Sequence, residues 1–316
     1  MSRSTAPRIL VIGELNVDIV AAGVQQPPEA GIEILAKDCE LTLGSASAIF
    51  ATGIAKLGCT VTFVSQVGKD NFGDFCVAAL KDAGISTRYV LRNADEKTGV
   101  TIALSNTRDR ALITFPGAIA SFSAKDCDTS LMKRHHHLHM TSYYLQRELK
   151  PSFPALFRQA KAAGLTTSFD PNTDPSQKWS RSINSVLKYV DVLFVNEREA
   201  TALTGRKNKR EALKALGQLV PCAVVKQGRR GADAIQNDEV VAGPGFRVEA
   251  VDTTGAGDSF AAGFVSAYVR HAPLAECLRV GNACGALSTL ALGGTPGQPT
   301  QEEMRTFLKS VLPRKS

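Results

Sequence analysis

The chain has 316 residues, of which 44% are apolar and 21% charged, which is enough for one large or two ordinary domains with a buried core. This composition excludes an intrinsically disordered chain, and no apolar run approaches the length that spans a bilayer. Lys and Arg outnumber Asp and Glu by 37 to 30, a formal charge of +7, while only 6% of the residues are aromatic. A spread-out basic excess with few aromatics favours small phosphorylated partners over a nucleic acid.

Short β-rich apolar runs alternate with longer helical patterns from the N-terminus onward. The predicted strands are Arg8 to Ile12, Val61 to Val67, His137 to Thr141, Thr166 to Phe169, Val192 to Val195 and Ala223 to Lys226. The predicted helices are Ser47 to Leu57, Phe72 to Ala83, Ser152 to Ala163, Arg181 to Tyr189, Glu197 to Thr204, Lys209 to Leu216, Ser259 to Arg270, Leu274 to Val280 and Ala283 to Leu290. This alternation is typical of an α/β fold with a parallel sheet covered on both faces. Gly58, Gly84 and Gly164 follow three of the helices, where a left-handed residue is needed.

Two segments interrupt the alternation, residues 17–43 and 97–116. In both, apolar and polar residues alternate around polar turns, as in half-exposed antiparallel strands. We predict that they form one small β-sheet inserted into a single domain of residues 1–316. Such a sheet has one apolar face to bury, so it covers a cleft as a lid or pairs with a second subunit.

Seven cysteines lie singly in apolar surroundings, with no C-x-x-C pair. We expect reduced, mostly buried thiols. The N-terminus runs from a short polar lead into an apolar strand with no small-residue cleavage site behind it, so secretion is not expected. These features predict a cytoplasmic protein without nucleic-acid or membrane partners.

The stretch VDTTGAGDSFAAGF, residues 251–264, carries the strongest chemical signal. Gly255, Ala256 and Gly257 open a predicted helix, whose first backbone N–H groups and dipole make an anion site that glycine keeps accessible. Asp258, in the first turn, is placed to accept a proton from an alcohol that attacks phosphorus. The alternative is that Asp258 only complements the helix dipole.

This motif resembles the C-terminal signature of the ribokinase-like (PfkB) family of carbohydrate and nucleoside kinases. Other segments match the family in order: GELNVDI (13–19), LGSASAIFATGIAKLG (43–58), VGKDNFG (67–73), FPGA (115–118), DPNTDPSQKW (170–179), NEREA (196–200) and KQGRRGA (226–232). The resemblance implies a Rossmann-like three-layer α/β/α core with a mainly parallel sheet and a small β-sheet lid.

The resemblance also implies roles for matching residues. Asp258 is the catalytic base and the Gly255–Gly257 turn is the anion hole for the transferred phosphate. Asn196 and Glu199 organise ATP and Mg²⁺, with Glu199 acting through water, although Asn-x-x-Glu after a strand is also an ordinary helix capping box. The other expected nucleotide-binding residues are Lys226, Gly228, Gly231 and Asn282. A plain glycine-rich turn and a helix–helix contact are the alternatives for these four positions.

The sugar-contacting loop of the family begins at Asn16 and Asp18, where a carboxylate orients sugar hydroxyls; a turn-forming Asn and Asp is the competing interpretation. The expected acceptor site is completed by Gly44, Ser45, Asp170 and Asn172. Asp252 and Thr254 match positions that hold a monovalent cation in several members, which leaves a potassium requirement open.

Two departures from the family pattern concern the acceptor. The usual Gly-Gly pair is Gly44-Ser45 here, and Ile49 replaces a common asparagine, so one hydrogen-bonding group is missing. Thr173 lies in a stretch where many sugar kinases carry an arginine. Ribokinase-like selection is therefore not assumed, and ribose, fructose and 2-keto-3-deoxy acids are all open acceptors.

One feature has no family role. The run HHHLHM places His135, His137 and His139 on one face of a predicted strand. Alternate histidines can ligate a metal, but no carboxylate or cysteine is adjacent. A strand with polar alternate positions near the core is the favoured interpretation.

Other enzyme classes are excluded by missing motifs. No G-x-G-x-x-G follows a predicted strand, and neither a P-loop nor a G-x-S-x-G elbow occurs. A non-catalytic sugar-binding regulator would lose the base or the anion hole, and both are present. A nucleoside kinase of the family would need an aromatic-lined lid, and residues 17–43 contain no Phe, Tyr or Trp.

We therefore predict an ATP-dependent, Mg²⁺-requiring sugar kinase, a homodimer associated through its lid. It is expected to phosphorylate a hydroxymethyl group of a small sugar or sugar acid, with a nucleoside kinase as the alternative.

Overall fold

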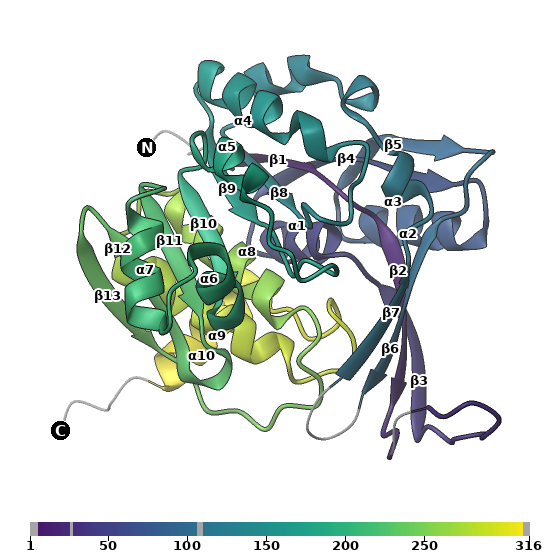
Figure 1. Cartoon of the computed structure of the whole chain (residues 1–316). Helices are drawn as coiled ribbons and strands as arrows, with labels where there is room; N and C mark the ends of the chain where they lie inside the picture. Colours follow the sequence, from purple (N-terminus) through teal and green to yellow (C-terminus); the bar gives the residue numbers. More distant parts are fainter. Residues whose placement is uncertain (1–5, 26–27, 106–109, 312–316) are drawn as a thin grey trace.

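Figure 1 shows a computed structural model of the chain, which describes residues 6–25, 28–105 and 110–311. The strands of its larger sheet are β1 (Arg8–Ile12), β4 (Thr60–Gly68), β5 (Ser86–Asn93), β8 (His137–Thr141), β9 (Thr166–Asp170), β10 (Val192–Asn196), β11 (Cys222–Lys226), β12 (Gly231–Gln236) and β13 (Glu239–Pro244). The order is β13-β12-β11-β10-β9-β8-β1-β4-β5. The strands from β11 to β5 run parallel, and β12 and β13 add an antiparallel edge. The prediction of a mainly parallel sheet is confirmed.

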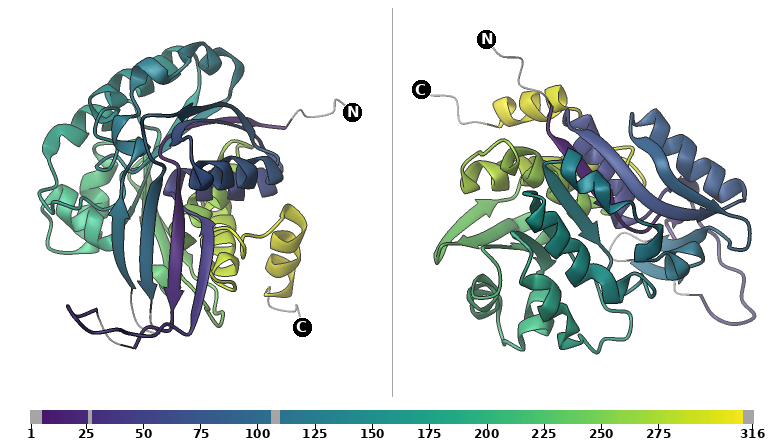
Figure 2. Two further views of the ribbon diagram at one scale, coloured as in Figure 1. Left: turned by 90° about the vertical axis from the view of Figure 1, so that its right-hand side faces the viewer. Right: turned by 90° about the horizontal axis from the view of Figure 1, so that it is seen from above.

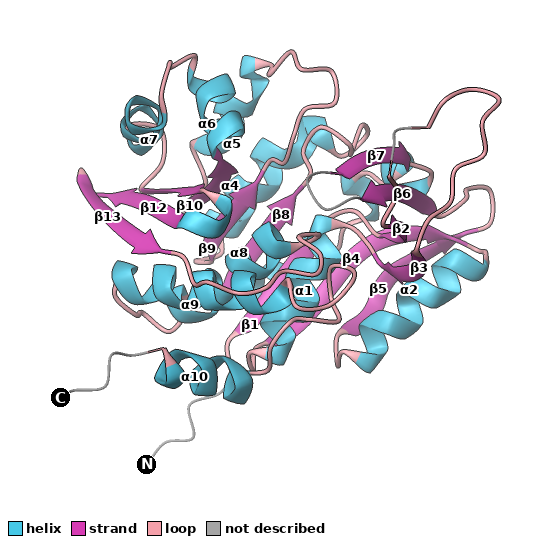
Figure 3. Ribbon diagram, turned by 90° about the horizontal axis from the view of Figure 1, so that it is seen from below, coloured by secondary structure: helices cyan, strands magenta, loops and turns pink. Residues whose placement is uncertain are grey.

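Helices cover both faces of this sheet (Figure 3). One face carries α1 (Ala46–Lys56), α2 (Asn71–Asp82), α8 (Ala256–Tyr268), α9 (Leu274–Ser288) and α10 (Gln301–Ser310). The other carries α4 (Phe153–Ala162), α5 (Asn184–Leu187), α6 (Glu197–Thr204) and α7 (Lys209–Gly217), while the short α3 (Ala118–Ser121) lies beside β4. Alternate residues of β1 enter the two cores, Ile9 and Val11 on one side and Leu10 and Ile12 on the other. The three-layer α/β/α prediction is therefore confirmed.

The C-terminal helices differ from the prediction of two separate segments. Residues 274–288 form one continuous helix, α9. Gly281 suggests a break by propensity, but its role is packing, because an added Cβ would lie 2.9 Å from the Phe260 ring. The strands β5, β12 and β13 and the helix α10 were not expected. The edge strands β5 and β13, the partly polar interior strand β12 and the polar amphipathic helix α10 all lack long apolar runs.

The predicted small sheet is present and has four strands, β2 (Asn16–Ala22), β3 (Asp38–Leu43), β6 (Gly99–Ser105) and β7 (Arg110–Phe115), in the order β3-β2-β6-β7. It extends away from the larger sheet (Figure 2). The two outer pairings are antiparallel, but β2 and β6 are parallel, so the prediction of purely antiparallel strands is wrong for the central pair. The reason is topological: β2 follows β1 and β6 follows β5, and β1 and β5 run in the same direction.

The two faces of the small sheet differ in polarity. Residues paired across strands share a face. One face carries Asn16, Asp18 and Thr101, and the other carries the cross-strand row Leu41, Ile19, Ile102 and Ile113. The first face turns toward the larger sheet, where a ligand would lie.

Strand order reverses between β1 and β8. From β1 the chain moves outward to β4 and β5, then returns to β8 and moves outward in the opposite direction to β11. In open α/β sheets, ligands bind outside the carboxyl ends of the strands at such a point.

Candidate active site

A cleft of about 1640 Å³ opens at these carboxyl ends, between the larger sheet, the polar face of the small sheet and the N-terminus of α8. Single small-molecule sites are typically about 300–1000 Å³, so this cleft has room for two ligands side by side. Of the site residues predicted from the sequence, all line the cleft except Gly44, Asp170 and Asp252.

The glycine turn stands at the start of α8, as predicted. Gly255 is the N-cap residue with φ 68° and ψ 4°, a left-handed conformation. A Cβ at this position would lie 2.9 Å from both Ile49 Cγ2 and Gly294 Cα, so the turn requires glycine for space as well as for conformation. Ala256 and Gly257 follow and line the cleft with Asp258, which is half-buried in the first helical turn. Backbone donors, the helix dipole and a carboxylate thus meet in one part of the cleft.

Lys226, at the end of β11, forms an ion pair with Asp170 at the end of β9. Lys226 Nζ lies 2.5 Å from Asp170 Oδ2, and the Asp170 side chain is 1% exposed. Burial opposes protonation of Lys226, but the negative charges of Asp170, Glu199 and Asp258 outweigh it and raise the pKa of the ammonium to about 12. One cation therefore lies among three carboxylates on the cleft floor.

Asn196 and Glu199 form the capping box of α6. Asn196 Oδ1 accepts from the Glu199 amide at 2.9 Å, and Glu199 Oε2 accepts from the Asn196 amide at 2.8 Å. The capping interpretation is thus geometrically correct, yet both residues also line the cleft. Glu199 Oε1 accepts from Thr173 Oγ1 at 3.1 Å. Burial, followed by the negative charge of Asp170, raises the pKa of the Glu199 carboxyl.

The expected nucleotide loop connects β11 to β12. Gly228 and Gly231 both have positive φ, and a Cβ on Gly231 would lie 2.1 Å from the Gly243 oxygen. Asn282 on α9 donates through Nδ2 to the carbonyl oxygens of Gly243 at 2.9 Å and Pro244 at 3.2 Å. Asn282 thus connects α9 to β13 instead of a second helix, and it borders the cleft from there.

The expected sugar-contacting residues lie on the polar face of the small sheet. Asn16 and Asp18 belong to β2, so the interpretation as turn residues is wrong. Asn16 Nδ2 donates to Asp18 Oδ1 at 3.0 Å. Gly44 is required beside them, because a Cβ there would lie 2.1 Å from the same Asp18 oxygen. Ser45 caps α1, accepting from the Ala48 amide at 3.1 Å.

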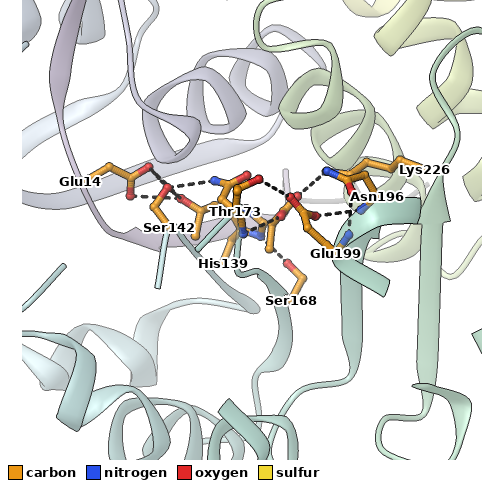
Figure 4. Close-up of polar contacts among 11 residues, drawn as sticks. Glu14, His139, Ser142, Ser168, Thr173, Asn196, Glu199 and Lys226 are labelled. Carbon is orange, nitrogen blue, oxygen red and sulfur yellow. Dashed lines mark hydrogen bonds and ion pairs between the residues drawn. The ribbon is translucent and has the colours of Figure 1, made fainter. Parts of the chain in front are cut away.

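Glu14, in the loop between β1 and β2, was not among the site residues predicted from the sequence. Its carboxylate is 2% exposed, lines the cleft and accepts hydrogen bonds from Ser47 and Thr141 and, at 2.8 Å, from Ser142 Oγ. Asn172 Nδ2 donates to Ser142 Oγ at 2.9 Å, which continues the chain of hydrogen bonds toward Asp170 (Figure 4). The signal in the sequence was an acidic residue two positions after a buried strand, because a carboxylate buried there needs several hydrogen-bond donors.

Asp252, three residues before the glycine turn, holds two loops together. Its Oδ1 accepts from the amide and the hydroxyl of Thr254, both at 2.9 Å, and its Oδ2 accepts from the Gly293 amide at 2.9 Å. Oδ1 therefore binds within the loop that precedes the glycine turn, and Oδ2 attaches that loop to the segment around Gly293.

The histidines of β8 have hydroxyl partners. His137 contacts Thr166 Oγ1 at 2.7 Å and Ser168 Oγ at 2.6 Å, and His139 contacts the same Ser168 oxygen at 2.7 Å. The His139 ring stacks on Phe50. Burial lowers the pKa of His137 to about 3 and also lowers that of His139, so both rings are neutral at pH 7. In the part of the chain that the structure describes, no group of three or more His, Cys, Asp or Glu is arranged to hold a metal ion. These contacts favour the structural interpretation.

The chain was compared with known proteins. The family model described as pfkB family carbohydrate kinase matches residues 6–301. The ATP-dependent ribose-1-phosphate kinase of Halopiger xanaduensis is 30% identical over 302 residues, 95% of this chain and 98% of that protein. Fructokinase-1 of Zea mays is 30% identical over 329 residues, 97% of this chain and 99% of its own.

Solved structures agree with these matches. Arabidopsis thaliana ribokinase, in complex with ribose and ATP, superposes with a TM-score of 0.82 at 27% identity, covering 96% of this chain and 99% of that one. A provisionally named ribokinase II of E. coli, in complex with ATP and Mg²⁺, has a TM-score of 0.84 at 26% identity, with coverage of 96% and 99%. No helix within the described residues is long and apolar enough to cross a bilayer.

Proposed function

Because the chain belongs to the pfkB family of carbohydrate kinases, and is thus a phosphotransferase with an alcohol group as acceptor, we propose that it transfers the γ-phosphoryl group of ATP to a hydroxymethyl group of a small sugar or sugar acid. The observation that carries this proposal is the position of Asp258. Its carboxylate lies beside the Gly255–Gly257 turn in a cleft with room for a nucleotide and an acceptor together.

In this proposal, the acceptor hydroxyl lies between Asp258 and the γ-phosphoryl group. Asp258 accepts the hydroxyl proton as the oxygen attacks phosphorus, and the amides of the Gly255–Gly257 turn stabilise the charge on the transferred group. A carboxylate is basic enough for this step, because the attacking alcohol becomes acidic late in a loose transition state.

The nucleotide half of the cleft is proposed to comprise the turn from Lys226 to Gly231, the 245–250 segment and the α9 side near Asn282. The donor set fits Mg²⁺, which binds through one or two carboxylates, waters and substrate phosphates instead of a full protein cage. Glu199 is the buried carboxylate that lines the cleft there, with Asn196 beside it. The ion would neutralise charge on the ATP phosphates, and Glu199 is proposed to hold it through water.

The acceptor half is proposed to use Asn16, Asp18, Ser45 and Asn172, with the small sheet as a lid that excludes water. The small sheet lines the cleft with residues such as Thr101, Ala103, Leu112 and Thr114, and the described lining includes no aromatic side chain from it. A nucleobase acceptor would need a stacking surface there, so a sugar is favoured over a nucleoside.

The test is release of ADP from Mg-ATP with a panel of sugars, sugar acids, sugar phosphates and nucleosides. We expect turnover with at least one sugar or sugar acid and none with nucleosides. Nucleoside turnover alone would support the alternative kinase. A sugar that raises the thermal midpoint without ADP release would instead identify a sugar-binding regulator.

We also propose a cytoplasmic location. All seven cysteines are unpaired and five of them are buried, and free thiols suit a reducing compartment.

A monovalent cation is proposed to bind beside Asp252 and Thr254, next to the anion hole. Dependence of the rate on potassium stays a prediction.

We further propose a homodimer through the apolar face of the small sheet. Leu41, Ile102 and Ile113 on its central row are 40%, 38% and 59% exposed, and Phe115 beside them is 51% exposed. The next row, Cys39, Ala21, Leu104 and Ala111, is also uncharged. In a twofold interface, the same patch of both subunits meets. This uncharged face can contact its own copy without burying like charges.

The dimer is tested by Ile113→Glu. Since Ile113 is exposed in one chain, the substitution should leave the fold intact but place two carboxylates in the interface. Light scattering should give about twice 33.7 kDa for the wild type at micromolar concentration and the single-chain mass for the variant. Leu219→Glu, at a residue 44% exposed outside the small sheet, is the control and should remain dimeric. A single-chain mass for the wild type would contradict the proposal.

A further inference from the structure

Five cationic side chains line the described cleft, and one of them differs from the rest. Lys226 has a side chain only 15% exposed, at the cleft floor. The other four are exposed: Arg147, Arg229, Arg230 and Arg247. Burial of an ammonium group at the end of an interior strand has a desolvation cost that an exposed lysine does not have. The position of Lys226 therefore calls for a specific explanation.

Lys226 lies against the glycine turn. A Cβ built on Gly257 would be 3.0 Å from Lys226 Nζ, so the ammonium touches the open side of the backbone that forms the anion site. Asp170 Oδ2 holds the same nitrogen at 2.5 Å. The backbone donors and the ammonium therefore converge on one place.

We propose that Lys226 is a catalytic residue that binds the transferred phosphoryl group, and that Asp170 is the positioning residue that aims it. This inference rests on the proposed kinase function and deepens it. Sequence reasoning places Lys226 only in a nucleotide-binding turn, and its position beneath Gly257 assigns it to the reacting end of the nucleotide.

The proposed phosphoryl transfer leaves Lys226 chemically unchanged. The acceptor oxygen forms a bond to the γ-phosphorus, the bond from that phosphorus to the bridging oxygen of ADP breaks, and the acceptor proton moves to Asp258. Lys226 keeps its protons and donates hydrogen bonds to the phosphoryl oxygens as the group moves between the two oxygens.

A relay of hydrogen bonds fixes Asp170 and thereby Lys226. Asp170 Oδ1 accepts from the Asn172 amide at 3.2 Å, and Asn172 Nδ2 donates to Ser142 Oγ, which donates to Glu14 (Figure 4). The buried Glu14 also binds Ser47 at the start of α1. The ammonium is thus attached to three strand ends and one helix.

The affinities for two nucleotides test whether Lys226 binds the transferred group, because ATP carries the γ-phosphoryl group and ADP does not. Calorimetry would compare ADP with the non-transferable ATP analogue in which nitrogen bridges the β- and γ-phosphates. Lys226→Met is expected to weaken binding of the analogue about 10- to 100-fold and binding of ADP by less than about threefold. Lys161→Met is the matched control, since Lys161 is also ion-paired, to Asp191 at 2.7 Å, but does not line the cleft. It should change neither affinity.

Removing Lys226 alone leaves Asp170 buried and unpaired, so the single variant is expected to be less stable. The double variant Lys226→Met with Asp170→Asn removes both charges and should recover thermal stability. If Lys226 only neutralises Asp170, the double variant will also recover the preference for the analogue over ADP, and the proposal is overturned. Continued loss of that preference in a stable double variant supports it.

Asp170→Asn alone tests the positioning role. We expect the analogue to bind about 3- to 10-fold more weakly, with ADP unchanged. A lower thermal midpoint with an unchanged ratio of the two affinities would overturn it. If the wild type binds neither nucleotide, the proposed function itself fails; if it binds both and Lys226→Met weakens both equally, only the assignment of Lys226 fails.

Discussion

Asp258→Asn is expected to lower kcat by about 1000-fold, within the range by which general bases contribute to catalysis, while the affinities for ATP and acceptor change by less than about threefold. The amide has nearly the shape of the carboxylate and leaves the Gly255–Gly257 turn in place. It cannot accept the proton of the attacking hydroxyl. The loss should therefore fall on the chemical step and not on binding.

The competing interpretation, that Asp258 only complements the dipole of α8, predicts a different result. Loss of one acidic side chain in a first helical turn costs about 0.3–1 kcal/mol of stability and leaves turnover nearly unchanged. Glu302→Gln is the matched control, because Glu302 lies in the first turn of α10 and does not line the cleft. Both variants should lose similar stability, but only Asp258→Asn should lose activity.

Steady-state kinetics with the acceptor found in the panel, together with thermal unfolding, makes this comparison. Retention of more than about a tenth of wild-type kcat by Asp258→Asn would remove Asp258 from the role of base. Loss of ATP binding in the variant would instead give Asp258 a place in the nucleotide site.

Much of the larger sheet was predictable because its strands are continuous apolar runs. A parallel strand buried on both faces, such as β1 or β10, must be apolar throughout, and the glycines after the helices specify where each turn begins. Gly58, Gly84 and Gly164 all have positive φ, as expected. The edge strands β5 and β13 carry no such signal, and the interior strand β12 was missed because its sequence, GADAIQ, includes a glycine and two polar residues.

The candidate site was predictable where a motif is local. The glycine turn and Asp258 are adjacent in sequence and have one geometry. Partners brought together by the sheet were not predictable: Lys226 and Asp170 are 56 residues apart, and Glu14 meets Ser142 across 128. Periodicity reports which face of an element is buried but not which strand lies next to it, so these pairs follow only from the strand order.

The conformation of Gly255 leads to the second large effect, because Gly255→Ala should damage stability and activity together. The residue has φ 68°, where a side chain costs about 1–2 kcal/mol, and the new methyl group would meet Ile49 and Gly294 at 2.9 Å. Overpacking of this kind typically adds about 1–3 kcal/mol. We expect a total loss of about 2–5 kcal/mol in the free energy of unfolding.

The new methyl group fits only if the turn moves, because Ile49 is buried and the Gly294 atoms that it would meet belong to the backbone. Displaced amides no longer point at the transferred phosphate, and loss of one such donor costs about 100- to 1000-fold in kcat. We therefore expect a fall of at least about 100-fold in kcat for Gly255→Ala, measured below its unfolding temperature.

Gly205→Ala is the control for conformation alone. Gly205 ends α6 with φ 66°, nearly the same value, but a Cβ there meets nothing within 4 Å. It should lose about 1–2 kcal/mol and keep wild-type kcat. Equal losses of stability in the two variants would show that Ile49 and Gly294 yield to the methyl group, and an unchanged kcat in Gly255→Ala would mean that the turn does not hold the transferred phosphate. A large kcat loss in Gly255→Ala alone would identify the turn as a rigid donor set whose aim depends on the close packing of Ile49.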